Sequence, residues 1–155
     1  MKKTKIKSAE DFIRLNGKFL GISKWININQ DLINHFADAT FDHQWIHIDE
    51  EKAYKESLTK TTIAHGYLTI SLIPYLLNDI IKVYNLKQLI NYSIKEIIFK
   101  SVVPVNSRLR LIATLKSAKD IGDICKANIF CQFEIEGQEE YALEGTIIYL
   151  YYFNN

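Results

Sequence analysis

The stretch of residues 63–84 restricts the possible folds more than any other part of the chain. Its apolar side chains lie on nearly every side of a helical projection, which predicts one long helix. A helix that is apolar all round must be enclosed, and a sheet wrapped around it is the expected solution. Pro74 removes one backbone donor and predicts a kink in the helix rather than its end. Polar residues interrupt the run well before the ~20 apolar residues of a membrane span, so we expect no membrane association.

The sequence that follows has the period of β-strands. Odd positions from 109 to 115 and from 129 to 135 are apolar, whereas most even positions between them are polar. Each run therefore predicts a strand with one buried face. Residues 92–103 supply another strand. Residues 141–153 are apolar on both faces over much of their length, which predicts a strand that is central or covered by another subunit.

We expect these four long strands to form an antiparallel meander around the helix. Glycine-containing turns at residues 120–123 and 136–139 would connect neighbouring strands. One helix packed on one curved antiparallel sheet is an α+β arrangement. Its edge strands would remain exposed, and dimerisation through a sheet edge is the natural remedy, so we expect a homodimer.

The first sixty residues predict shorter elements. Ser8 and Asp11 occupy the positions of a capping box at the start of a surface helix that stops near residue 17. Residues 19–28 have strand character, Asn29 is an expected N-cap for a helix, and Asp49 begins another. Between these helices, residues 40–48 have neither helical nor strand periodicity. That irregularity predicts a loop that carries functional side chains.

Length and charge exclude several classes of function. The 155 residues suit a single domain, 1–155, and no linker or repeat indicates a boundary. The net charge of +1 comes from 19 basic and 18 acidic residues spread along the chain, which argues against nucleic acid. Polar residues follow the positively charged start Met1-Lys2-Lys3 where an export signal would be apolar, so a cytoplasmic protein is expected. Cys125 and Cys131 lie ~20 Å apart on one predicted strand, which predicts reduced core thiols.

Asp42 and His47 are the candidates for chemistry in the segment 40–48. A carboxylate and an imidazole that converge on one water can take its proton and return a proton elsewhere, which is general acid and base catalysis. The alternative from spacing alone is that Asp42 caps backbone N–H groups while His47 is exposed. A metal site would add His43 and His65. The spacing matches no common zinc pattern and no cysteine is near, so no metal is expected.

Gly66 follows His65 at the start of the long helix. A helix N-terminus has unpaired N–H groups and partial positive charge, and glycine lets a ligand oxygen approach the backbone. The N–H of Gly66 is therefore a candidate for binding an oxygen on which negative charge develops. We interpret His65 mainly as a structural group that caps or packs beside Gly66.

Two sequence segments together resemble one known family. Residues 36–53, FADATFDHQWIHIDEEKA, and residues 61–76, TTIAHGYLTISLIPYL, are similar to the MaoC-like dehydratases, or (R)-specific enoyl-CoA hydratases, in particular the NodN-like branch. The resemblance implies a hot-dog fold, in which a long helix is rolled inside an antiparallel sheet. It assigns the catalytic pair to Asp42 and His47 and the contact with the thioester carbonyl to Gly66.

The activity implied by the resemblance is the reversible hydration of a trans-2-enoyl-CoA, or another enoyl thioester, to the (3R)-3-hydroxyacyl thioester. The acyl carrier would be CoA or an acyl carrier protein, and the reaction would belong to fatty acid metabolism. No metal or redox cofactor is required. Hot-dog proteins also include acyl-CoA thioesterases, and a third alternative is an acyl-thioester binding or dimerisation module without catalysis. The spacing of Asp42 and His47 favours hydration.

The sequence departs from the family pattern near these residues. Phe41 stands where many relatives have glycine, Ile98 where arginine is common, and Asn106 where glycine is. These departures leave the acid and base pair intact and bear mainly on substrate choice. Aromatic residues near an apolar helix are more often core than channel lining. The candidates for lining an acyl channel are Phe41, Trp45, His65 and Tyr67.

Overall fold

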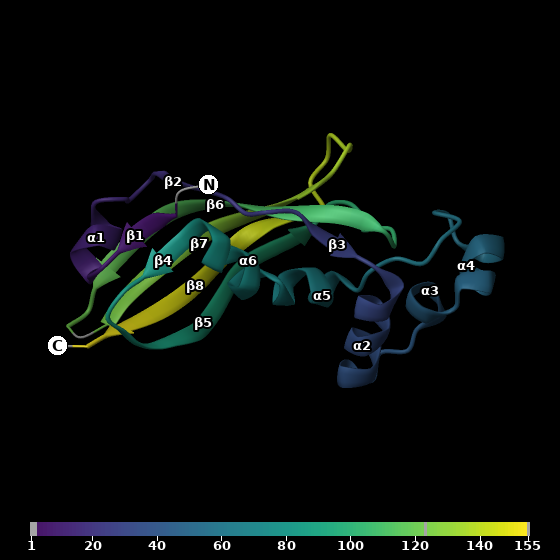
Figure 1. Ribbon diagram of the computed structural model, residues 1–155, viewed down its shortest axis with the longest axis horizontal. Helices are drawn as coiled ribbons and strands as arrows, with labels where there is room; N and C mark the ends of the chain where they lie inside the picture. Colours follow the sequence, from purple (N-terminus) through teal and green to yellow (C-terminus); the bar gives the residue numbers. More distant parts are fainter. Residues whose placement is uncertain (1–2, 123, 155) are drawn as a thin grey trace.

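A curved, six-stranded antiparallel sheet forms the body of the computed structural model (Figure 1). Residues 3–122 and 124–154 are described, so Met1, Lys2, Asn155 and Asp123, which belongs to the predicted turn 120–123, lie outside the described part. The strands are β1 (Thr4–Ile6), β2 (Phe19–Ile22), β3 (Ile26–Ile28), β4 (Ile81–Val83), β5 (Leu86–Phe99), β6 (Ser107–Asp120), β7 (Ile124–Ile135) and β8 (Leu143–Phe153). The helices are α1 (Ala9–Ile13), α2 (Gln30–Thr40), α3 (Trp45–Ile48), α4 (Glu50–Glu56), α5 (Gly66–Ser71) and α6 (Ile73–Ile80).

The strand order in the sheet is β2–β6–β7–β8–β5, with β3 also paired to β6. β6, β7 and β8 form an antiparallel meander, and β8 is central, in keeping with its two apolar faces. The expectation of four strands in one meander is wrong at β5, which pairs with β8 instead of β6. The connection 100–106 runs from β5 to β6, and the segment before α5 is hydrogen-bonded to it. Ala64 N donates to Val103 O at 2.8 Å, and Val105 N donates to Thr62 O at 2.9 Å.

The alternation along β6 and β7 separates core side chains from outer ones. The odd positions from 109 to 115 and from 129 to 135 are buried, so both predicted strands are confirmed. Cys125 and Cys131 lie buried on β7 as free thiols, as predicted. Burial raises the pKa of Cys125 and of Cys131 to about 12. Both thiols are therefore protonated at neutral pH and serve as core side chains.

The long apolar stretch forms two helical segments, α5 and α6, that meet at Leu72. This residue keeps right-handed helical dihedral angles, φ −78° and ψ −13°, so the helix bends near Pro74 rather than ending there, as predicted. The bend precedes the proline because the proline ring crowds the preceding turn. The helix does not extend to residue 84 as expected, because residues 81–83 form β4, which pairs in parallel with β1.

The sheet covers only one side of this helix. Leu68, Ile73 and Leu76 are buried, whereas Tyr67 is 72% exposed and Tyr75 is 65% exposed. The expectation of a completely enclosed helix is therefore wrong for the described chain, since the six-stranded sheet leaves these side chains uncovered. Apolar surface remains along α5 and α6.

Helices α2, α3 and α4 lie beyond one end of the sheet (Figure 1). Asn29 Oδ1 accepts from Leu32 N at 2.9 Å at the start of α2, and Asp49 Oδ1 accepts from Lys52 N at 2.9 Å at the start of α4. The predicted N-cap Asn29 is confirmed, and the helix expected to begin at Asp49 has this residue as its N-cap. These two capped helices form the arm that carries the segment 40–48.

The N-terminal residues differ from expectation in two details. Ser8 has the N-cap position of α1 without a capping hydrogen bond, and Asp11 Oδ2 accepts from Lys7 N at 2.9 Å. Residues 19–28 form two strands instead of one, because Ser23 interrupts them and bridges to β6. Its N–H donates to Leu111 O at 2.8 Å, and its Oγ accepts from Leu111 N at 2.9 Å.

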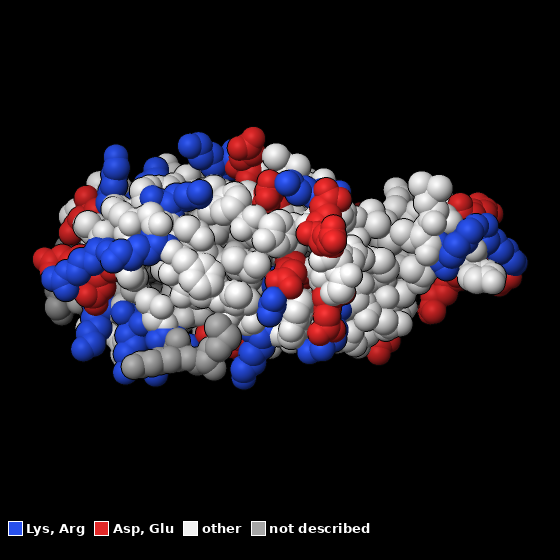
Figure 2. Space-filling view, turned by 90° about the horizontal axis from the view of Figure 1, so that it is seen from above, with Lys and Arg blue, Asp and Glu red and all other residues white. Residues whose placement is uncertain are grey.

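The charged side chains are mixed over the surface. On the face shown in Figure 2, both signs occur at each end and across the middle, so this face has no continuous basic patch for nucleic acid. Within the described residues, no helix is both long enough and apolar enough to cross a membrane.

Candidate active site

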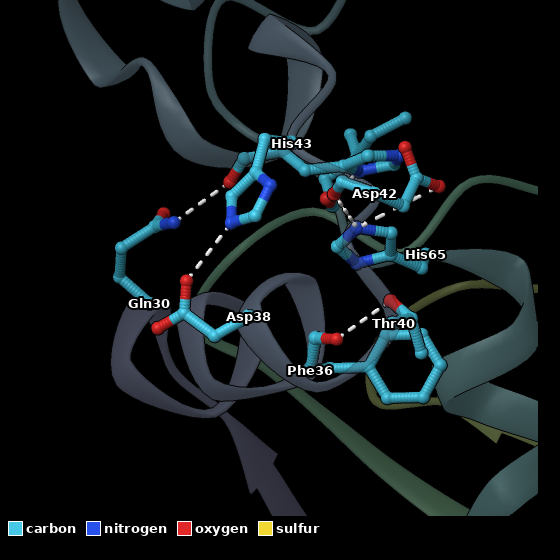
Figure 3. Close-up of polar contacts among 9 residues, drawn as sticks. Gln30, Phe36, Asp38, Thr40, Asp42, His43 and His65 are labelled. Carbon is cyan, nitrogen blue, oxygen red and sulfur yellow. Dashed lines mark hydrogen bonds and ion pairs between the residues drawn. The ribbon is translucent and has the colours of Figure 1, made fainter.

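Helix α2 brings Asp42 to the site. The helix ends at Phe41, whose backbone has the left-handed conformation (φ 61°, ψ 20°) that glycine adopts most readily. After this reversal, Asp42 O accepts a hydrogen bond from His65 Nε2 at 2.9 Å (Figure 3). The Asp42 carboxylate lies 3.9 Å from the same nitrogen, and its side chain is more than half exposed.

His47 lies on α3, a single helical turn. The prediction of an irregular loop is therefore wrong for the second half of the segment 40–48. His47 Nδ1 lies 2.7 Å from Ile63 O. A carbonyl oxygen can only accept, so Nδ1 carries the proton and neutral His47 has its lone pair on Nε2. The alternative of an exposed His47 is wrong, because the residue is only 7% exposed.

The rings of His47 and His65 stack, with centroids 3.7 Å apart and planes inclined by 24°. His65 is 2% exposed and occupies the N-cap position of α5. It also packs against Phe36 of α2, with ring centroids 5.1 Å apart. Its Nε2 donates to Asp42 O, and its Nδ1 has no hydrogen-bond partner among the described residues. His65 thus connects the segment that carries Asp42 to the turn that carries His47.

Burial lowers the pKa of His47 below its usual value of 6.5. The Coulombic effect of His65 acts in the same direction, whereas the hydrogen bond to Ile63 O and the charge of Asp42 act against it. His47 is therefore neutral at pH 7. In the described part of the chain its Nε2 makes no hydrogen bond, so this atom is available to accept a proton.

Asp42, His47 and His65 each place one ligand atom within 4.8 Å of the others. This geometry suits proton transfer better than one shared metal ion. Stacked imidazoles direct their lone pairs in nearly parallel planes, and His65 Nε2 already donates to Asp42 O. His43, the fourth residue considered, turns away to Asp38 Oδ1 at 2.9 Å (Figure 3).

A cavity of about 330 Å³ lies beside His47 and the start of α5. Gly66 lines this cavity and is the first residue of α5, so its N–H has no acceptor within the helix. No other acceptor for this N–H lies in the described part of the chain. His47 and Gly66 therefore present a proton acceptor and a hydrogen-bond donor to the same space, which is near the lower limit of ligand-site volumes.

The remaining candidate residues take different positions around this cavity. Tyr67 lines it, whereas Phe41, Trp45 and His65 do not. Phe41 is 86% exposed at the end of α2. Trp45 lines a separate hollow, and His65 lies behind the ring of His47. Asp42 borders the His47–His65 pair without lining the cavity itself.

Sequence reasoning missed two contributors to the site. Phe99 and residues 101–103 form much of the cavity wall, which no local pattern indicates because the pairing of β5 with β8 places them there. Gln30 is the second contributor, because it holds α3 by a hydrogen bond. Its Nε2 donates to His47 O at 2.7 Å, and its Oε1 accepts from Thr62 Oγ1 at 2.5 Å. Gln30 has no sequence signal beyond its place at the start of α2.

Similar sequences cover almost the whole chain. The family profile described as MaoC like domain matches residues 14–129. The chain is 38% identical over 145 residues to 3-hydroxyacyl-thioester dehydratase Z of Mycobacterium tuberculosis, which covers 93% of this chain and 95% of that protein. It is 36% identical over 153 residues to Nodulation protein N of Rhizobium meliloti, which covers 95% of this chain and 92% of that protein.

The fold is also found among solved structures. R-hydratase PhaJ1 from Pseudomonas aeruginosa, in its unliganded form, superposes with a TM-score of 0.72. The match covers 90% of this chain and 83% of that chain at 16% sequence identity. At this identity the likeness concerns the fold alone.

Proposed function

This chain belongs to the MaoC-like domain family and has the hot-dog fold, and on that premise we propose that it hydrates trans-2-enoyl thioesters reversibly to (3R)-3-hydroxyacyl thioesters. It is an enzyme of the dehydratase type, a carbon–oxygen lyase. The acyl carrier is CoA or an acyl carrier protein. The addition of water changes no oxidation state overall, so the proposal includes no redox cofactor.

The observation that carries the proposal is that His47 and Gly66 line one cavity. Because His47 Nδ1 donates to Ile63 O, the basic Nε2 is the nitrogen left for a water. The lowered pKa of His47 keeps this nitrogen unprotonated at neutral pH. A general base in this state contributes typically 10²- to 10⁴-fold to a rate.

In the proposed reaction His47 and Asp42 hold one water beside Cβ of the substrate. His47 Nε2 takes a proton from the water as its oxygen forms the bond to Cβ, and the Cα–Cβ double bond becomes single as Cα receives a proton from the pair. The carboxylate of Asp42, within 4.8 Å of the imidazole, stabilises the imidazolium formed during this step. The two groups act as one unit, and dehydration is the same path reversed.

Negative charge grows on the thioester oxygen during the addition, and Gly66 N–H is the proposed donor for it. The N–H begins α5 and has no acceptor in the described chain, so it costs no rearrangement to bind the oxygen. Removing one donor of this kind from an oxyanion hole lowers kcat by about 10²- to 10³-fold in known cases.

We also propose that two copies pair through β5. This strand forms an edge of the sheet, and its exposed residues include Tyr92, Ile94 and Ile98, which are 47–56% exposed. An open edge strand of 14 residues with exposed apolar side chains is a surface that proteins normally cover. Light scattering after size-exclusion chromatography should give twice the chain mass of 18.0 kDa. A monomer at micromolar concentration would contradict this pairing.

Incubation of the purified protein with crotonyl-CoA tests the reaction. We expect the enone absorbance to fall without release of free thiol, and chiral analysis should identify (3R)-3-hydroxybutyryl-CoA. Release of thiol would indicate a thioesterase instead. If the enone absorbance stays constant and no thiol is released, but calorimetry detects binding of the thioester, the protein is a binding module. Formation of the (3S) product would contradict the proposed stereochemistry while leaving hydration in place.

A further inference from the structure

Gly66 lacks a side chain because the ring of Phe99 occupies the space. A Cβ atom at position 66 would lie 2.6 Å from Phe99 Cε1 and 3.0 Å from Cδ1 and Cζ, which is closer than a Cβ atom can approach without displacing its neighbour. The backbone does not require glycine here, because the positive-φ glycines do not include Gly66. The glycine therefore serves a close approach rather than a special backbone conformation.

A second glycine lets β5 approach β8 closely just before Phe99. Phe99 is the last residue of β5, and β5 shifts register against β8 between Ile94 and Glu96. Gly145 of β8 pairs with Ile97, next to this irregularity, and a Cβ atom at position 145 would overlap the carbonyl O of Glu96. The backbone of β5 thus enters space that any other residue at 145 would fill. Bulges of this kind redirect the side chains that follow them.

The ring of Phe99 is placed at the cavity instead of in the core. It is 50% exposed, and it meets the ring of Tyr67 edge-on with centroids 6.3 Å apart. Phe99, Tyr67, Gly66 and His47 all line the same cavity. An aromatic ring against the first residue of α5 keeps water from one side of its peptide. A hydrogen bond made in such a less polar environment is stronger.

We propose that Phe99 is a positioning residue for the Gly66 amide, an inference that rests on the hydration reaction proposed above. The ring packs against the α-carbon of Gly66 and holds the first peptide of α5 in one orientation. The thioester carbonyl oxygen then meets a donor that is fixed before the reaction, which is the condition for stabilising charge in the transition state. Phe99 acts through Gly66 and transfers no proton.

A double-mutant cycle tests this contact because Gly66→Ala keeps the N–H and adds only a methyl group. With Phe99 present, the methyl displaces the ring, and we expect kcat for crotonyl-CoA to fall about 10²-fold with KM changed much less. Phe99→Ala alone should lower kcat about 10-fold. In Gly66→Ala/Phe99→Ala the methyl has room, so the double variant should be about as active as Phe99→Ala and roughly 10-fold more active than Gly66→Ala.

Phe19→Ala is the matched control, because Phe19 is a similarly exposed phenylalanine on β2 that does not line the cavity, and its kcat should be unchanged. If the wild type is active and the kcat losses of the two single variants multiply in the double variant, the proposed role of Phe99 is overturned and the proposed reaction stands. An inactive wild type would overturn the proposed reaction. Thermal unfolding then tests the contact between residue 66 and the ring of Phe99. Gly66→Ala should lower Tm, and adding Phe99→Ala should recover that loss. Additive Tm changes would overturn the contact.

Discussion

The imidazole ring of His47 stacks on that of His65, and His65 in turn donates a hydrogen bond to Asp42 O. The expected pair, Asp42 and His47, is therefore held together through a third side chain. Their ligand atoms lie within 4.8 Å of one another, which leaves room for a bridging water. His65 fixes the relative position of the two groups that the proposed reaction uses.

The pH profile of kcat/KM should show an acid limb below pH 6.5. The proposed base is neutral His47, so activity is lost as the pH falls through the pKa of this residue in the free enzyme. Burial and His65 lower that pKa from its usual value of 6.5. Initial rates of crotonyl-CoA hydration at low substrate concentration, measured from pH 4.5 to 8, give the limb. A limb centred above pH 6.5 would contradict neutral His47 as the base.

His65→Phe should move this acid limb to higher pH. The variant keeps an aromatic ring for the stack but removes the Coulombic effect of His65, which lowers the pKa of His47. It also removes the hydrogen bond to Asp42 O, so the maximal kcat should fall by about 10-fold, the equivalent of one typical hydrogen bond. His35→Phe on the exposed side of α2 is the control and should leave the limb in place. An unshifted limb in His65→Phe would show that His65 does not influence the charge of His47.

His47→Gln and Asp42→Asn should each lower kcat at least ~10²-fold, the usual contribution of a positioned acid or base. Both substitutions preserve size and hydrogen bonding and remove the ability to exchange a proton. Asp38→Asn is the matched control, because Asp38 is exposed on α2 and pairs with His43 away from the cavity. Circular dichroism checks that each variant is folded. Full activity of either His47→Gln or Asp42→Asn would remove that residue from the mechanism.

Site residues on short continuous segments could be predicted from the sequence, whereas a residue brought to the site by strand pairing could not. Asp42, His47 and Gly66 lie on two short segments whose residue types indicate acid, base and donor. Phe99 reaches Gly66 through the pairing of β5 with β8, which shifts register just before Gly145. Register and bulges depend on partner strands, so no periodicity within β5 predicts them.

The fold shows the same division. The period-2 pattern predicts β6 and β7 correctly because one face of each is buried. The position of β5 in the sheet was predicted wrongly because pattern alone does not say which neighbour a strand pairs with. The helix was expected to continue into residues 81–83, which instead pair with β1 at the start of the chain. Pairing between residues so far apart overrides local helical periodicity.

Phe41→Gly should stabilise the protein. Phe41 ends α2 with φ 61°, a conformation that costs an L-residue roughly 1–2 kcal/mol and glycine very little. The greater backbone freedom of glycine in the unfolded state offsets part of this stabilisation, by roughly 0.5–1 kcal/mol. The ring is 86% exposed, so its removal loses little burial. The free energy of unfolding in urea should therefore rise by up to about 1 kcal/mol.

Phe41→Ala is the control for this prediction, since it removes the ring but keeps the Cβ atom that makes the conformation costly. Its free energy of unfolding should stay near that of the wild type or below it. A rise in Phe41→Ala equal to that in Phe41→Gly would assign the effect to the ring instead of the backbone.

Gln30→Ala should weaken both stability and activity, because Gln30 links the start of α2 to the two segments that hold the site. Its Nε2 donates to His47 O at 2.7 Å, and its Oε1 accepts from the hydroxyl of Thr62, which is fully buried. The variant leaves this hydroxyl without its acceptor, at a cost of about 1–3 kcal/mol in unfolding free energy. Without the bond to His47 O, α3 is held less firmly, so kcat should fall while the acid limb of the pH profile keeps its position. Gln138→Ala in the exposed turn after β7 is the control, and urea titrations together with crotonyl-CoA kinetics measure both effects. If stability falls while kcat is unchanged, Gln30 supports the fold of α3 but does not place His47 Nε2 for the reaction.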